Sequence, residues 1–471
     1  MSKLMTCLVF AALLLIAASL AAQEEKTQGL DKGTQEIQAV GTPASAGDAA
    51  VKTDEQKTDA QSGIPDEASL FGGETVSDNK NVIKDTVSSV IEKERVSFSG
   101  SLASRNSYTM TRDWMSGDNH GFKNVFSAWF DANFNLDIRL YSGVKAYASA
   151  SLEYYPTETT VISSTFKTYQ ENDVEYPLEE IFIDINARKH AYFRIGKQFL
   201  KWGVGYLWNP TDVINIEKKN ILDPYQVREG VYGLKVTVPV GTRFNFYAFL
   251  NFNDAKDVDR IGVSGKAEVL IGNTEMALSA SWRRDSHPVI GYEITSRLFT
   301  VDLHGEVSAS PGTNGKILDG MTVKENPEGW TTMICAGLGR GFDVLNVHDR
   351  IRLDFEFFYN HSGYTEKIFN NDVRMAYFIQ SGCYVPNYYG RFYTGLFMTV
   401  SQLGTSELSA SVNWIFNIED QSSVIMALLT WTPLYNLELS FGLNGFPGPD
   451  NAEYTFWNGA LQTLINVRVV F

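Results

Sequence analysis

The chain has 471 residues, of which 44% are hydrophobic and 13% aromatic, and its formal net charge is −15. The acidic balance argues against nucleic-acid binding, because a protein that neutralises phosphates needs a basic patch and the sequence offers none. Beyond residue 22, no segment has the roughly 18 consecutive apolar residues of a membrane-spanning helix, so helical spans are excluded as well.

Residues 1–22 have the features of a secretory signal peptide. Lys3 supplies the positive start, Leu4 to Leu20 form the apolar stretch, and Ser19-Leu20-Ala21 is a small-x-small cleavage site. We expect cleavage at Ala21 or Ala22 and export of the mature chain.

Residues 23–94 are rich in Gln, Glu, Asp, Thr, Lys, Ala and Gly and contain few large apolar residues. Such a segment buries too little apolar surface to offset the entropy lost on ordering, so we expect a disordered, acidic periplasmic linker. A second reading is a short helix that binds peptidoglycan or a periplasmic partner, since Ile83, Val87, Val90 and Ile91 would share one helical face.

From residue 95 to the C-terminus the sequence alternates between apolar and polar residues. In Phe126 to Ile138 every second residue is apolar, and the residues between them are almost all polar. The same split recurs at 180–186 and 351–357. This period of two predicts strands with one apolar and one polar face, although a soluble sandwich would alternate as well.

Three further features favour a membrane barrel. The apolar stretches are about 9 to 13 residues long, which suits a tilted strand crossing ~25 to 30 Å of hydrocarbon. Aromatic residues gather towards strand ends, as at Tyr154-Tyr155 and Tyr388-Tyr389, where a membrane interface would lie. The last strand ends at Phe471, and such a terminal aromatic resembles the signal read by the barrel assembly machinery. We therefore expect an all-β fold, a transmembrane antiparallel up-and-down barrel over residues 95–471, surrounded by outer-membrane lipid.

The strand count and the connections predict the topology. About nineteen segments qualify as strands, but a single-chain bacterial barrel with both termini in the periplasm needs an even number. The weakest segment is Asp372 to Gly382, and without it eighteen remain, with sixteen still open. Short turns at 188–190, 240–242 and 403–405 are expected on the periplasmic side. The long connections are expected outside, at 106–122, 156–177, 200–229, 310–329, 361–390 and 444–460.

A barrel of this size is wide enough to hold an aqueous lumen unless loops fill it. Across the turn at 188–190, Asp184 falls opposite Arg194 and Glu180 opposite Gln198. These pairs either create an electric field across the lumen that orients polar solutes, or are solvated pairs on the wall that contribute little energy. The expected lumen residues carry both signs, which predicts at most a weak cation preference. They are Asp131, Asp137, Arg139, Glu180, Asp184, Arg194, Gln198, Arg352, Asp354 and Glu356.

The alternation stops at about Leu200 and resumes only near residue 230. Gly203, Gly205 and Pro210 demand turns, while Trp202 and the aromatic residues after it are too apolar for a freely solvated loop. We expect this segment to fold back into the lumen and narrow it; the alternative is an extracellular lid packed on its own aromatic residues. The expected constriction residues are Lys201, Trp202, Asp212 and Arg228.

Short motifs in this stretch resemble those of a known group of proteins. Gly196-Lys197-Gln198, Trp202-Gly203 and Asn209-Pro210-Thr211-Asp212 precede Arg228-Glu229-Gly230, which leads into a strand. The pattern is similar to that of a broad family of porin-like proteins related to alginate-export-type outer-membrane channels. The resemblance covers about 50 residues strongly and the rest of the barrel only by strand rhythm. It implies a large monomeric barrel with a partly occluded lumen and names no solute; the acidic linker departs from the compact N-terminus expected for that family.

No constellation of nucleophile, base and orienting group points to an enzyme, and we expect no metal site and no cofactor. His304 lies in a strand near Glu306, which a lumen ladder explains. Cys335 and Cys383 remain after export, and whether they pair stays open.

The predicted function is a channel for passive diffusion of small polar solutes. One alternative is a surface barrel whose loops bind host or matrix ligands. Another is a transporter of apolar molecules, for which Trp129, Tyr147 and Phe182 would face the lumen.

Overall fold

The structure is a computed structural model that describes residues 96–111, 124–141, 143–157, 159–162, 166–200, 202–214, 229–253, 255, 258–457 and 459–471. The expected signal peptide (1–22) and acidic linker (23–94) lie outside the described residues. Two of the expected constriction residues, Lys201 and Arg228, lie outside them as well.

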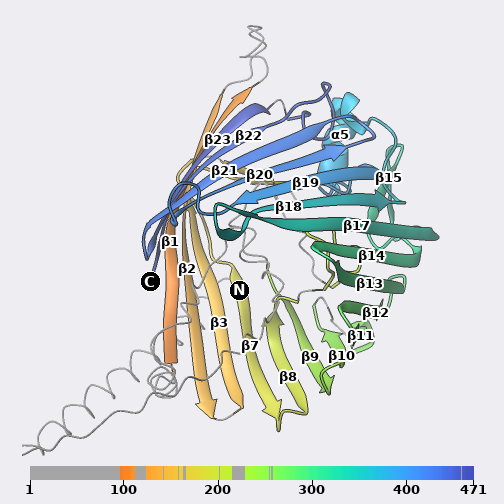
Figure 1. Cartoon of the computed structure of the whole chain (residues 1–471). Coiled ribbons are helices and arrows are strands. Elements are labelled where there is room, and N and C mark those ends of the chain that lie inside the picture. Colours follow the sequence, from red (N-terminus) through yellow and green to blue (C-terminus); the bar gives the residue numbers. More distant parts are fainter. Residues whose placement is uncertain are drawn as a thin grey trace, which may run out of the picture. The chain divides into compact units, whose positions relative to one another are not determined.

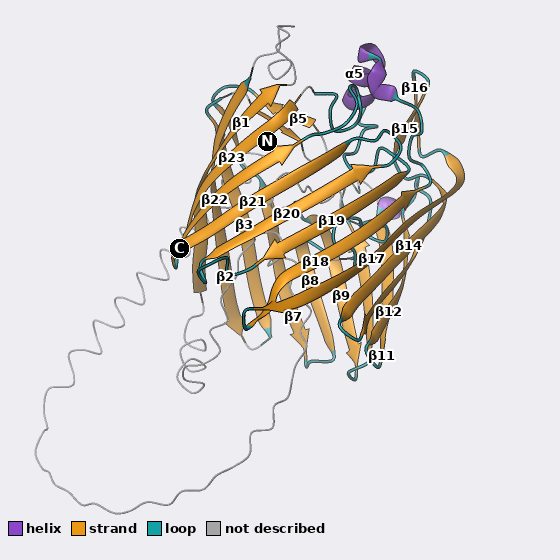
Figure 2. Cartoon of the chain, turned by 45° about the horizontal axis from the view of Figure 1, so that its top comes forward, coloured by secondary structure: helices purple, strands orange, loops and turns teal. Residues whose placement is uncertain are grey.

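Eighteen antiparallel strands close into a barrel (Figure 1 and Figure 2). Each strand pairs with the next along the chain, and the last pairs with the first. The three-residue strand β6 (Asp173–Glu175) adds a nineteenth member to the sheet beside β3. The barrel strands are β1 (Val96–Thr111), β2 (Val125–Tyr141), β3 (Val144–Tyr155), β7 (Leu178–Ala187), β8 (Ala191–Gln198), β9 (Val231–Val240), β10 (Phe244–Asn251), β11 (Gly262–Ile271), β12 (Thr274–Trp282), β13 (Val289–Leu298), β14 (Val301–Gly312), β17 (Glu328–Val344), β18 (Val347–Asn360), β19 (Phe392–Val400), β20 (Leu408–Asn417), β21 (Ser423–Leu434), β22 (Leu437–Gly445) and β23 (Gly459–Val470).

The two faces of the wall differ in chemistry, as the alternation predicts. Phe130, Leu278 and Phe441 are about half exposed on the outer face. The residues next to them in sequence point inward. The pairing register keeps Asp131 and Ser279 on that inner face from strand to strand. An apolar outside and a polar inside are what a barrel needs when lipid surrounds it and water fills it. The predicted transmembrane all-β fold with eighteen strands is confirmed.

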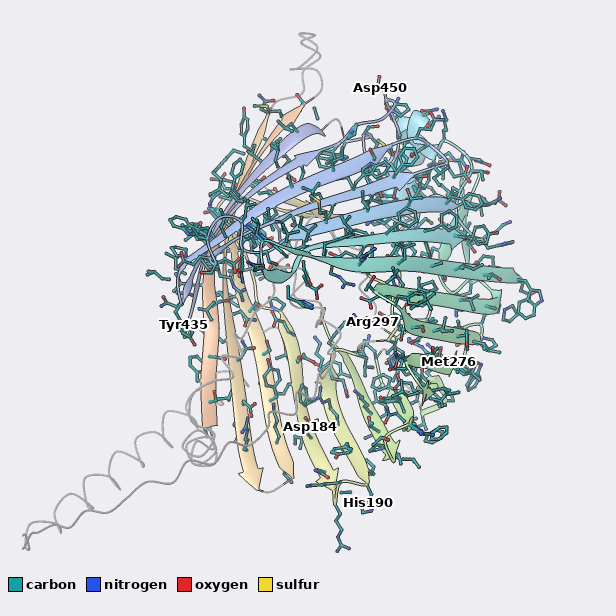
Figure 3. The ribbon with its side chains drawn as sticks, in the orientation of Figure 1. Asp184, His190, Met276, Arg297, Tyr435 and Asp450 are labelled. Carbon is teal, nitrogen blue, oxygen red and sulfur yellow. The ribbon has the colours of Figure 1, made fainter. Side chains whose placement is uncertain are left out.

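The longest connections all lie on one rim of the barrel. Turns of two or three residues, such as 142–143, 188–190 and 345–346, share one rim with the start of β1 and the end of β23. The connections 156–177, 199–230, 313–327, 361–391 and 446–458 share the other. We call these the short-turn rim and the long-loop rim. In Figure 3, His190 and Tyr435 mark turns of the short-turn rim, and Asp450 marks a connection of the long-loop rim.

The weakest strand candidate, Asp372 to Gly382, is a helix in the connection between β18 and β19. Helix α5 (Asp372–Gln380) follows Asn371, whose side chain accepts a hydrogen bond from the backbone N–H of Arg374 at 3.0 Å. Asn is a favoured helix N-cap, and Asp372 in the first turn complements the helix dipole. No helix within the described ranges has the length and apolar character needed to cross a membrane.

The long-loop rim has a small apolar core of its own. Helix α5, the short 3₁₀ helix η2 (Ile368–Asn370) and the hairpin β15 (Lys316–Asp319) with β16 (Thr322–Glu325) pack together there. A second hairpin joins β4 (Thr159–Ile162) to β5 (Phe166–Tyr169), and the 3₁₀ helix η1 (Val258–Arg260) follows β10. The buried members of the core are Leu318, Ile368, Phe369, Phe378, Cys383, Tyr384 and Tyr389.

The two cysteines left open by the sequence do not pair. Cys383 belongs to the apolar core of the long-loop rim, whereas Cys335 faces inward from β17, and both are free buried thiols.

Candidate functional site: a lumen crossed by one segment

The segment that follows β8 crosses the inside of the barrel. We call residues 202–214 the crossing segment. It leaves β8, the fifth barrel strand, and contacts β18, the thirteenth, so the two attachments are eight strands apart in a ring of eighteen. Such strands lie almost opposite each other. The predicted inward fold therefore holds for residues 202–214, whereas residues 215–228 lie outside the described residues.

Two carboxylates on the opposite wall hold the crossing segment by its backbone. Glu306 on β14 accepts hydrogen bonds from the N–H groups of Val204 and Gly205, the latter at 2.6 Å, and from both the N–H and the hydroxyl of Thr211, at 3.2 and 2.9 Å. Its side chain is 3% exposed. A buried carboxylate is stable only with such compensation, and each of these bonds contributes about 1.5 to 3 kcal/mol.

Glu356 on β18 binds the next three residues in the same way. It accepts from the backbone N–H groups of Tyr206, Leu207 (2.9 Å) and Trp208 (3.4 Å). The ring of His304 lies 2.8 Å from the same carboxylate, which is fully buried. Glu356 was expected to face the lumen, and it does face inward, but it contacts the crossing segment.

A third inward carboxylate, Glu293 on β13, extends this set of anchors. It accepts from the hydroxyl of Thr211 at 2.8 Å and from the ammonium of Lys266 at 2.7 Å. Lys266 also pairs with Glu268 at 3.0 Å. Each buried charge thus has an opposite charge or a hydrogen-bond donor beside it.

Aromatic packing completes the attachment. The indole of Trp208 is fully buried, lies 5.4 Å from the ring of Phe358 and 5.8 Å from that of Tyr393, and donates to the carbonyl of Asn387 at 2.9 Å. Tyr206 lies 4.2 Å from Phe397. These partners lie on β18, β19 and the long-loop rim, so the side chains of Tyr206 and Trp208 attach the segment to all three.

Gly203 can be no other residue without strain. Its φ is +92°, and a Cβ there would lie 2.5 Å from Asn209 Oδ1 and 2.9 Å from Glu306 Oε1. The turn expected from this glycine brings the chain close to its anchor.

Two expected constriction residues are described, and both are buried. Trp202 packs with Leu200, Ile214, Val231 and Phe249 in an apolar cluster near the start of the segment. Asp212 is 5% exposed. Both belong to the segment that fills part of the lumen, while their role at a constriction stays a prediction.

The other expected lumen residues project from the inner face, mostly in ion pairs. The carboxylates of Asp131, Asp137, Asp184 and Asp354 lie 2.7, 2.7, 2.7 and 2.8 Å from the nitrogens of Arg105, Lys145, Arg194 and Arg352, respectively. Arg139 lies 3.8 Å from Asp137, Glu180 accepts from the N–H of Phe199 at 2.7 Å, and Gln198 is buried against the carbonyl of Gly233 at 3.2 Å.

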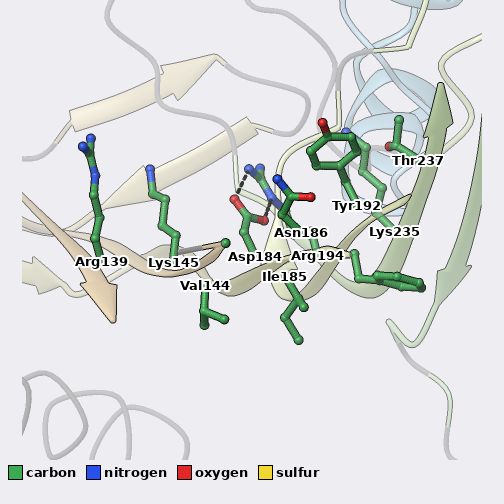
Figure 4. A pocket seen from close by; sticks show the side chains of 12 residues that line it. Arg139, Val144, Lys145, Asp184, Ile185, Asn186, Tyr192, Arg194, Lys235 and Thr237 are labelled. Atoms are coloured by element: carbon green, nitrogen blue, oxygen red, sulfur yellow. Dashed lines mark hydrogen bonds and ion pairs between the residues drawn. The ribbon is translucent and has the colours of Figure 1, made fainter. Parts of the chain in front are cut away.

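A cavity of about 510 Å³ opens on the inner face near the short-turn rim (Figure 4). Its charged lining consists of Arg139, Lys145, Asp184, Arg194 and Lys235, and we call it the basic vestibule. Figure 4 shows Arg194 turned towards Asp184, with Lys145 and Lys235 on either side.

Sequence reasoning missed Lys145, Lys235, Glu293 and Glu306 as site residues, although Glu306 was noted beside His304. Each lies at an inward position of an alternating strand, so the period of two contained the signal.

Two clusters among the described residues have metal-ligand chemistry: Asp343, His348 and Asp349 are exposed, and the other cluster is already occupied by protein groups. Ligand atoms of His304, Cys335 and Glu356 lie within 4.8 Å of one another. Both oxygens of Glu356 accept hydrogen bonds from the crossing segment, so a metal would have to displace them.

No protein-family model and no curated protein matches this chain. Among solved structures, OccK8 (OprE) from Pseudomonas aeruginosa matches at 9% identity over 80% of this chain and 98% of that chain, with a TM-score of 0.51. OccAB4 from Acinetobacter baumannii matches at 7% identity over 80% and 98%, with a TM-score of 0.50. The relation to alginate-export-type channels stays a prediction. The described part of this chain therefore has the fold of the eighteen-stranded outer-membrane porins.

Proposed function

We propose that this protein is an outer-membrane channel for passive diffusion of small polar solutes, narrowed by the segment 200–229. The observation that carries the proposal is the crossing segment, which is anchored by Glu306 and Glu356 on the opposite wall. A fixed segment across a wide barrel narrows its lumen, so the proposed channel admits small solutes and excludes large ones.

The route to the membrane is part of this proposal. Residues 1–22 direct export, the barrel assembly machinery reads Phe471, and both termini lie in the periplasm, where the acidic linker is free to meet a partner. The support from geometry is that Phe471 sits half exposed on the outer face of the short-turn rim, 6.1 Å from the ring of Phe98.

The lumen chemistry supports polar solutes over apolar ones. Of the aromatic residues expected to attract apolar molecules, Phe182 lies under the guanidinium of Arg194 at 3.7 Å and Trp129 has Arg105 at 6.0 Å. Rings covered by cations offer little bare apolar surface.

Planar-bilayer recording of the purified protein tests the proposal. Stable single-channel steps, together with liposome swelling by small sugars, amino acids and organic acids but not by fatty acids, are the expected result. Heat-denatured protein is the control. Folded protein that gives no steps while its long loops bind a ligand would support the surface-binding alternative and overturn the channel.

A further inference from the structure

Strand β21 breaks the alternation of the barrel wall, because both of its faces are apolar. Its outward residues include Ile425 and Leu429, which are exposed on the outer face. Its inward residues Val424, Met426 and Leu428 are apolar too, whereas polar residues are typical of inward positions in a water-filled barrel. Val424 and Met426 are buried within the protein, but Leu428 is only half-buried. Part of its apolar side chain is therefore open on the inner face.

A second inward leucine meets Leu428 over a glycine. Gly442 on β22 lies between Leu428 on β21 and Leu464 on β23 in the pairing register. A Cβ at Gly442 would lie 3.1 Å from the Cβ and the Cδ1 of Leu464 and 3.5 Å from the Cδ1 of Leu428. The two leucines thus lean over the glycine, and Leu464 is half-buried like Leu428. We call Leu428, Gly442 and Leu464 the leucine patch, an apolar surface three strands wide on the inner face.

Amide and hydroxyl groups flank the leucine patch along the barrel axis. Asn413, Asn444 and Gln462 lie on the side of the long-loop rim. Thr430 and Asn466 lie on the side of the short-turn rim. The amide of Asn444 donates to Gln462 Oε1 at 3.1 Å, so the N–H groups of Gln462 are oriented away from that contact, while Asn413 Oδ1 is buried and accepts no hydrogen bond from the described residues. The flanks therefore offer both donors and acceptors.

Charge is nearly absent from this part of the wall. Strands β20 to β23, which run side by side in Figure 1, contain only Glu438 and Arg468 as charged residues, and these two oppose each other beside the short-turn rim. Of the adjacent strands, β19 has no charged residue and β1 has only Arg105, which pairs with Asp131 at 2.7 Å. A solute on the leucine patch is therefore surrounded by neutral groups.

This combination suits one class of small polar solute. A charged solute would lose hydration here without gaining a counter-charge. An open-chain polyol is neutral, but it has no flat apolar face to cover the leucines. A pyranose sugar is neutral and has a face of C–H groups edged by hydroxyl groups, so its chemistry matches both the leucines and the amides.

We propose that the leucine patch and its amide flank form a binding track for neutral pyranose sugars. Leu428 and Leu464 contact the face of the sugar ring, Asn413 and Gln462 bind its hydroxyl groups, and Asn444 positions Gln462. This rests on the proposed function, because a track in the lumen acts only in a conducting channel. It narrows the small polar solutes of that function to neutral rings at this part of the wall.

Glucose and sorbitol test the proposal, because they are of nearly equal size and differ in that only glucose is a ring. Liposome swelling with the purified full chain is expected to be about twofold or more faster in glucose than in sorbitol. Millimolar glucose is also expected to lower the single-channel KCl current, as a bound sugar obstructs the lumen, whereas sorbitol at the same concentration leaves it unchanged.

Substitutions assign these effects to residues. In the double variant Leu428→Gln/Leu464→Gln the ratio of the two swelling rates is expected to fall to about one, with sorbitol entry retained. Leu464→Met, which keeps the apolar contact, is expected to retain the ratio. Asn413→Leu removes the acceptor without adding a polar group to the wall, and it is expected to weaken the current block by glucose about threefold or more. Heat-modifiable mobility on gels identifies the variants that fold.

Leu345→Gln is the matched control, because it removes a leucine that is 79% exposed in a turn of the short-turn rim. An equal change in this control, or equal swelling by glucose and sorbitol in the unmodified channel, would overturn the sugar track while leaving the channel intact. Folded protein that conducts neither ions nor solutes would instead overturn the proposed function.

Discussion

Glu356 is fully buried and accepts hydrogen bonds from three consecutive backbone N–H groups, so it anchors the crossing segment. The substitution Glu356→Gln replaces one acceptor oxygen by an amide that cannot accept. We expect the free energy of unfolding to fall by about 2 to 3 kcal/mol, and the single-channel conductance to become larger and noisier as the segment loosens. Thermal unfolding in detergent and bilayer recording measure the two effects.

An exposed carboxylate serves as the control for this substitution. Glu328→Gln, at the start of β17 on the long-loop rim, is expected to change neither quantity. Unchanged conductance in Glu356→Gln would mean that the crossing segment does not depend on this anchor.

Gly203 and Gly241 separate two costs of replacing glycine. Both have positive φ, +92° and +64°, but only at Gly203 would a Cβ meet neighbouring atoms. Gly241→Ala is expected to cost about 1 kcal/mol of unfolding free energy from backbone strain alone and to leave conductance unchanged. Gly203→Ala is expected to cost more and to alter conductance, because the chain must move away from Glu306. Equal effects of the two substitutions on stability and conductance would contradict this geometry.

At the scale of elements, the connection 446–458 is held on the long-loop rim by one buried acid. Glu453 accepts from the N–H of Asn387 at 2.9 Å, the hydroxyl of Tyr393 at 2.7 Å and the amide of Asn417 at 2.8 Å. Burial, reinforced by repulsion from Asp420, raises its pKa from 4.5 to about 8. The hydrogen bonds oppose this shift without cancelling it.

The pH dependence of this connection follows from that shift. An acid whose pKa is raised on folding stabilises the folded state at low pH, and this stability is lost as the pH rises from about 4.5 to about 8. We expect the hydrogen-exchange protection factors within 446–457, which are corrected for the intrinsic pH dependence of exchange, to be higher at pH 6 than at pH 9. Glu453→Gln is expected to abolish the difference, whereas Asp450→Asn, at an exposed position of the same connection, keeps it. Lower protection at pH 6 than at pH 9 would refute the assignment.

The elements differ in how well the sequence predicts them. Strands such as β2 can be predicted locally, because the polarity of each residue indicates which face of the wall it lies on. The predicted even number of strands depended on rejecting residues 372–382 as a strand. Those residues form a helix that Asn371 caps, a signal present in the sequence that the strand count did not use. The inward path of the crossing segment was predicted only as one of two alternatives, because its anchors lie about 100 and 150 residues away in the chain.

At the scale of the whole molecule, closure depends on the pairing of the last strand with the first. Phe471 exchanges two backbone hydrogen bonds of 2.9 Å with Gly100, and its ring lies near Phe98 and Phe134. Because we propose that Phe471 is the assembly signal, we expect Phe471→Ala to lower the amount of assembled barrel several-fold. Heat-modifiable mobility of outer-membrane fractions on gels measures this amount. Phe299→Ala, at a highly exposed aromatic residue in a turn of the same rim, is the control; an equal loss there would remove any special role for the terminal residue.

The crossing segment is held mostly by hydrogen bonds from its backbone N–H groups, and this affects which substitutions it tolerates. A peptide N–H is supplied by nearly every amino acid, so Val204 can be exchanged while its hydrogen bond to Glu306 persists. Tyr206 and Leu207 are also held by their side chains, through the ring of Phe397 and through burial. Under the proposed function, a substitution at Val204 changes a side chain of the crossing segment while the backbone hydrogen bonds that hold the segment across the barrel remain.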